Sequence, residues 1–90
     1  MGKVIITMKL LPDSAERDID SWGELLRVGL KDKAEILKMN KEPIAFGLNC
    51  LKLIILVPDR EGIMTEVENI IQNIEGVSDV SVVDMSRTLE

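Results

Sequence analysis

The sequence contains no histidine, no tyrosine and a single cysteine, Cys50. The absence of histidine removes the commonest general base and the commonest metal ligand. One cysteine excludes an internal disulfide, a Cys-x-x-Cys redox pair and a zinc ribbon. Aromatic residues make up 2% of the chain, as Trp22 and Phe46, so the core must be built from aliphatic side chains.

Long apolar runs are also absent. The most apolar stretch, residues 51–57, is interrupted by Lys52 and is much shorter than the roughly 18 residues needed to cross a bilayer. The chain opens on Met-Gly-Lys-Val and an alternating segment rather than on the apolar block of a signal peptide. We therefore expect a cytoplasmic protein with no membrane partner.

Acidic residues outnumber basic ones by 16 to 11, which gives a net charge of −5. Phosphate backbones repel such a chain, which argues against direct binding of nucleic acid. The 90 residues, 46% of them hydrophobic, suit one domain spanning 1–90 with a real core. A deep, enclosed active site is hard to build at this size.

Strand-like and helix-like periods alternate along the first half of the chain. Residues 3–11 alternate between apolar and mixed positions, which predicts a half-buried strand ended by Pro12. A helix should follow, with Asp18 as its N-cap and Gly29 near its end. Its apolar stripe comprises Ile19, Trp22, Leu25, Leu26 and Leu30.

The second half repeats the order with one more strand. A charged strand over 35–42 suits a sheet edge, and a nearly all-aliphatic strand over 48–57 suits the sheet interior. After a turn at 58–62, Thr65-x-x-Glu68 predicts a capping box and Gly76 a helix stop. The apolar stripe of this second helix consists of Met64, Val67, Ile70, Ile71 and Ile74. The last strand carries Val77, Val80, Val82, Val83 and Met85.

The order β-α-β-β-α-β predicts an α+β fold of the ferredoxin-like type. This is a two-layer sandwich with a four-stranded antiparallel sheet and two helices on one face. Trp22 is interpreted as a core residue on the helical stripe, Cys50 as a small buried apolar residue and the methionines as gap-fillers. For Phe46, which precedes Gly47 in a link between strands, a core-capping role and an exposed anchor stay open.

This chain lacks the residues that most activities of such folds require. A heavy-metal carrier needs paired thiolates, an RNA-recognition domain needs aromatic residues on its sheet, and neither is present. The loop after the first strand, residues 11–14, is acidic and has no glycine nest for an anion. No phosphate-binding glycine motif occurs, so we expect no catalytic residues, no metal and no cofactor.

The segment 42–48, Glu-Pro-Ile-Ala-Phe-Gly-Leu, resembles the signature of the archaeal elongation factor 1-beta family. Further landmarks in the family's order surround it: Met8–Pro12, Val57–Gly62, Ile74–Val77 and Val82–Met85. The similarity therefore spans the whole chain.

This resemblance implies a guanine-nucleotide exchange factor for the GTPase elongation factor 1-alpha, acting without covalent chemistry. We expect a monomer, because the sequence shows no large exposed apolar patch. By the same resemblance, Phe46 corresponds to a loop phenylalanine that packs on the GTPase, in a loop shaped by Pro43 and Gly47. Ile44 and Arg87 are expected to bind the partner as well. Eukaryotic relatives carry a penultimate lysine near the magnesium site, but here the nearest cation to the end of the chain is Arg87.

A sensor module of the ACT-like class is the alternative, because it shares the βαββαβ order. Such modules pair edge to edge and bind a small effector at the interface. They have a glycine-rich turn after the first strand, where this chain has Pro12-Asp13-Ser14. A stable dimer would favour this alternative over the exchange factor.

Overall fold

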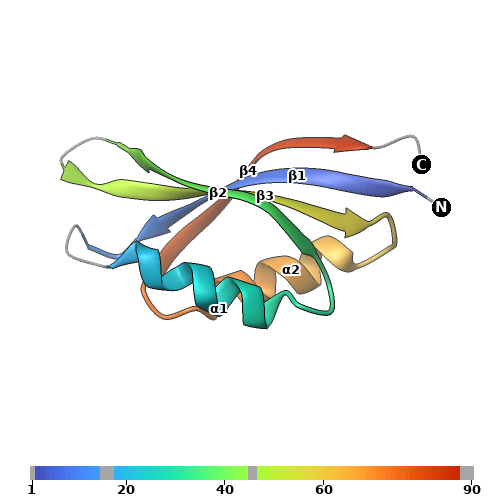
Figure 1. Cartoon of the computed structure of the whole chain (residues 1–90), viewed down its shortest axis with the longest axis horizontal. Coiled ribbons are helices and arrows are strands. Elements are labelled where there is room, and N and C mark those ends of the chain that lie inside the picture. The colour runs from blue at the N-terminus through green and yellow to red at the C-terminus, as the bar shows by residue number, and fades with distance from the viewer. Residues whose placement is uncertain (1, 15–17, 45–46, 88–90) are drawn as a thin grey trace.

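The computed structural model describes residues 2–14, 18–44 and 47–87, and these form one sheet covered by two helices (Figure 1). The sheet has the order β2-β3-β1-β4, with every neighbouring pair antiparallel. The predicted βαββαβ, ferredoxin-like fold is therefore confirmed. The elements are β1 (Lys3–Pro12), a 3₁₀ turn (Ile19–Ser21), α1 (Trp22–Gly29), β2 (Glu35–Pro43), β3 (Asn49–Pro58), α2 (Ile63–Gln72) and β4 (Val77–Arg87).

The core lies between the helices and one face of the sheet. Both helices lie on the same side of the sheet in Figure 1. Alternate residues of the two central strands face them and are buried, whereas most of the intervening residues on the other face are half-buried. The buried residues on the helix-covered face are Val4, Ile6, Met8 and Leu10 of β1 and Leu51, Leu53, Ile55 and Val57 of β3. As expected, β2 is an edge strand and β3 is an interior strand.

The first helix begins with a tighter turn than the sequence predicts. Asp18 caps it, because its side chain accepts a hydrogen bond from the backbone N–H of Asp20 at 3.1 Å. Trp22 is buried as expected, and its indole N–H donates to the carbonyl of Glu75 at 3.2 Å. The prediction for Leu25 is wrong, since 48% of it is exposed. Steps of four residues along α1 align Trp22, Leu26 and Leu30 in the buried stripe, and Leu25 lies beside it.

Both predicted ends of the second helix are wrong. The helix begins at Ile63, so Thr65 lies inside it, and the N-cap position is Gly62 with no side-chain cap. Gly62 has a φ of 84°, a left-handed conformation that glycine adopts without strain. The helix ends at Gln72, and Gly76, with a φ of 94°, instead belongs to the turn that leads into β4.

The pairing register between β1 and β4 shifts by one residue at Val83. Thr7 pairs with Asp84 and Met8 pairs with Val82, so Val83 is an extra residue on the outer strand. Met85, predicted as a core gap-filler, is 49% exposed on this edge strand.

Gap-filling is confirmed for the other described methionines. Met8 is fully buried, and Met39 and Met64 pack against the core, while Met1 lies outside the described residues. Cys50 is buried, as predicted.

Candidate functional site

The link between β2 and β3 joins these two strands at one end of the sheet (Figure 1). Its base is fixed by the pairing of Pro43 with Asn49 and by a short hydrogen bond from the Ile44 N–H to the Leu48 carbonyl, at 2.7 Å. Pro43, Ile44 and Gly47 are all exposed. The structure therefore brings these sequence-predicted site residues together on a surface accessible to a partner.

Gly47 provides the conformation that returns the chain to β3. Its φ is 75°, and no atom lies within 4 Å of the place where a Cβ would stand. Glycine is needed at this position because of the backbone angle rather than because of crowding. Phe46, the expected anchor of the site, lies outside the described residues.

Arg87 lies at the opposite end of the sheet from this link. It is the last residue of β4 and pairs with Val4, whereas Leu10 of the same strand β1 pairs with Leu51 near the link. The six residue steps along β1 from Val4 to Leu10 span about 20 Å at roughly 3.3 Å per residue. The structure therefore does not bring Arg87 together with the link.

An exposed ion pair connects Arg87 to the turn before α2. Its Nη1 lies 3.2 Å from Oδ2 of Asp59, and 74% of the arginine side chain is exposed. An ion pair this exposed is weak. The guanidinium is consequently available to an external acidic group at modest cost.

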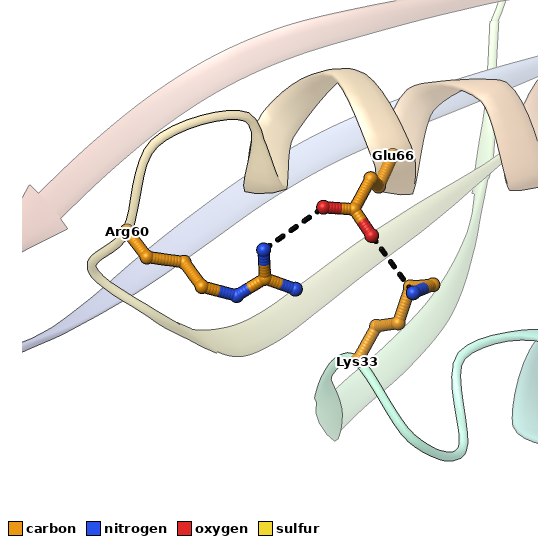
Figure 2. A network of polar contacts seen from close by, with 3 residues as sticks. All are labelled: Lys33, Arg60 and Glu66. Atoms are coloured by element: carbon orange, nitrogen blue, oxygen red, sulfur yellow. Dashed lines mark hydrogen bonds and ion pairs between the residues drawn. The ribbon is translucent and has the colours of Figure 1, made fainter.

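The same end carries a network centred on Glu66 (Figure 2). Lys33 donates to Oε1 of Glu66 at 2.8 Å, and Arg60 donates to Oε2 at 2.9 Å. The hydrogen bond from Lys33, and after it the one from Arg60, lowers the pKa of Glu66 below its ordinary value near 4.5. Desolvation has a smaller effect in the opposite direction. The network joins α2 to the turn before it and to the segment that follows α1.

A hollow of about 330 Å³ lies next to Arg87, between the start of α2 and the end of β4. Its apolar lining includes Met64 and Met85, and the charged Asp59 and Arg60 also line it. Within the described residues, no group of three or more cysteine, aspartate or glutamate side chains could hold a metal ion. No helix in the part of the chain described is both long enough and apolar enough to cross a membrane.

Sequence reasoning missed a charged cluster beside the link. Glu42 lies within ion-pair distance of Lys9 and Lys52, at 3.5 Å and 3.8 Å. The signal was present in the sequence only as isolated charges. Their proximity depends on the pairing register of three strands, which the sequence pattern does not specify to a single residue.

Comparison with known proteins places these features in a family. Residues 5–88 match the model of the EF-1 guanine nucleotide exchange domain. The chain is 41% identical over 88 residues to elongation factor 1-beta of Aeropyrum pernix, covering 97% of this chain and 98% of that protein. It is 39% identical to elongation factor 1-beta of Thermofilum pendens, covering 97% of both chains. With elongation factor 1-beta of Methanothermobacter thermautotrophicus the identity is 35%, covering 99% of this chain and 100% of that protein. The chain therefore belongs to the EF-1 guanine nucleotide exchange domain family.

Proposed function

We propose that the protein is a guanine-nucleotide exchange factor that promotes GDP release and GTP loading on elongation factor 1-alpha. The observation that carries this proposal is the family match, which extends over residues 5–88 and thus over nearly the whole fold. The exposed link between β2 and β3 supplies a surface suited to the task.

Exchange of this kind requires no covalent chemistry. A protein that binds the nucleotide-free GTPase more tightly than the GDP-bound GTPase weakens the affinity of the GTPase for GDP in the same ratio. A 10³-fold acceleration of GDP release requires a preference of about 4 kcal/mol for the opened state. One buried aromatic anchor with a few polar contacts provides free energy of this order.

In our proposal Phe46 is that anchor. Pro43 limits the backbone at the start of the link, Gly47 allows its return, and the Ile44–Leu48 hydrogen bond closes its base. A pre-shaped segment loses less conformational entropy on binding than a free one. Docking of this segment is the principal contact of the proposed complex.

Arg87 provides a second contact in the proposed complex, at the other end of the molecule. The continuous strands β1 and β3 connect the two ends, so the separation between the contacts is set by the sheet. The nucleotide and its magnesium ion belong to the GTPase, and this chain acts in the cytoplasm as a monomer without a cofactor of its own.

Release of a fluorescent GDP analogue from elongation factor 1-alpha tests the proposal directly. The GTPase loaded with the analogue is mixed with excess GTP in a stopped-flow instrument, with and without this protein. Acceleration that rises with protein concentration and then saturates is the expected result. Unchanged release at every concentration, with a matched archaeal GTPase, would contradict the proposal, and a stable dimer that binds a small effector would then favour the sensor module.

A further inference from the structure

Lys9 and Lys52 are directly opposed residues of the two central strands, β1 and β3. Both side chains are only about a third exposed, at 39% and 33%. The shared ion pair with Glu42 places both on the face of the sheet that bears no helices. Directly opposed side chains on one face have Cβ atoms about 5 Å apart, and like charges in this arrangement destabilise a sheet. This pair of lysines therefore requires a counter-ion.

Glu42 supplies the counter-ion from a third strand. Its Oε1 lies 3.5 Å from the Nζ of Lys9, and its Oε2 lies 3.8 Å from the Nζ of Lys52. Glu42 belongs to the edge strand β2, and β3 separates that strand from β1. The carboxylate therefore connects the edge strand to a strand that is not its neighbour.

Glu42 lies one residue before the end of β2. The next residue, Pro43, ends β2 and has no N–H to donate to the ladder. Beyond it, the Ile44 N–H donates to the Leu48 carbonyl across the link. Backbone pairing holds this end of β2 to β3 alone, and the ion pairs of Glu42 add a connection to β1.

We infer that Glu42, held by Lys9 and Lys52, is a positioning residue that fixes the β2–β3 link for docking onto the partner GTPase. This inference rests on the function proposed for the link. Ion pairs this exposed add little to global stability, so their loss should be felt locally, at the end of β2. Looser positioning of the link raises the entropic cost of docking, and the chemistry of the GTPase is not altered.

The expected kinetic effect separates affinity from maximal rate. Glu42→Gln removes the negative charge at nearly constant size, and leaves Lys9 and Lys52 opposed without this counter-ion. We expect the concentration of exchange factor that gives half-maximal GDP release to rise about 3- to 10-fold, with the maximal rate unchanged. Glu35→Gln is the matched control, because Glu35 lies on the same strand and, by its register, on the same face at the other end.

Hydrogen exchange of the Ile44 amide measures the positioning without any partner. We expect Glu42→Gln to lower protection of this amide and to leave protection of the buried Ile55 amide unchanged. The charge-reversed pair, Lys9→Glu with Glu42→Lys, should restore both the Ile44 protection and the half-maximal concentration. A merely structural role would change the Ile44 and Ile55 amides together.

Two results would overturn the inference. One is an unchanged Ile44 protection in Glu42→Gln, and the other is a lowered protection with an unchanged half-maximal concentration in an active factor. If the wild-type chain itself fails to accelerate GDP release, the proposed function fails and the role of Glu42 in exchange fails with it. The Ile44 measurement would still decide, in that case, whether Glu42 holds the link.

Discussion

Ile70 of α2 approaches Gly29 of α1 so closely that a Cβ on Gly29 would stand 2.9 Å from the Cγ2 atom of Ile70. The two helices therefore meet at a point where only a hydrogen occupies the α-carbon. Both helices cover the sheet that carries the two ends of the proposed docking surface. The Gly29–Ile70 contact limits how closely the two helices pack against each other on that sheet. It also distinguishes Gly29 from Gly23, the other glycine of α1.

Substituting these two glycines should change stability in opposite directions. Gly29→Ala forces the helices apart, and we expect a loss of about 1–3 kcal/mol in the free energy of unfolding. Gly23→Ala places its Cβ 3.5 Å from Cε of Met39, an ordinary contact, and should stabilise the helix by up to about 1 kcal/mol. Urea unfolding followed by circular dichroism measures both. Equal effects of the two substitutions would show that the helix contact is not limiting.

Trp22 should be more sensitive to substitution than its position near a helix end suggests. Trp22→Phe keeps an aromatic ring but loses the hydrogen bond to the Glu75 carbonyl and leaves part of a buried volume empty. We expect a cost of about 1–3 kcal/mol in the free energy of unfolding. Circular dichroism is the suitable probe, because the variant has no tryptophan fluorescence. A cost below the error of the measurement would mean that the core relaxes around the smaller ring.

Glu66 should make stability fall in acid. Its pKa in the folded protein lies below its ordinary value near 4.5, so the folded state binds its proton less readily than the unfolded state does. The contribution is therefore fully present above the ordinary pKa and is lost as the pH falls through the lower, folded value. Glu66→Gln should remove this part of the pH dependence of the urea midpoint, whereas Glu68→Gln on the same helix serves as the control. A carboxyl titration by NMR that places the pKa of Glu66 above 4.5 would contradict the network in Figure 2.

Arg87 should affect exchange through its charge. Arg87→Ala is expected to slow exchange about 3- to 10-fold at low ionic strength, an effect that salt reduces, while Arg87→Lys retains most of the activity. The exposed ion pair with Asp59 makes the folded protein nearly indifferent to the change. Stopped-flow exchange at two salt concentrations provides the measurement. An alanine variant as active as the wild type at both would remove Arg87 from the docking surface.

The sequence predicts the sheet better than the helix ends, and the reason is physical. Strict alternation in β1 and the aliphatic run of β3 follow directly from which faces are buried. Thr65 and Glu68 match a capping pattern, but the helix already begins at Ile63, after the left-handed Gly62. A local pattern cannot show which of two competing starts the rest of the fold selects.

Some features of the candidate site can be predicted from the sequence, and others cannot. The exposed link with Gly47 at a positive φ follows from proline and glycine chemistry that the sequence displays. The ion pairs of Glu42 with Lys9 and Lys52 do not, because they join three strands whose register is set by the whole sheet. Distance along the chain likewise gives no indication that Arg87 and the link lie at opposite ends.

The most direct test of the account is the effect of Phe46→Ala on GDP release from elongation factor 1-alpha. Val28→Ala is the matched control, because Val28 is an apolar side chain that is 74% exposed and belongs to α1 rather than to the link. We expect Phe46→Ala to reduce the acceleration at least about 30-fold, in keeping with a loss of about 2 kcal/mol or more for a buried aromatic anchor. Its circular dichroism spectrum and the activity of Val28→Ala should match those of the wild type. Full acceleration by a folded Phe46→Ala variant would contradict the claim that the β2–β3 link is the principal docking surface.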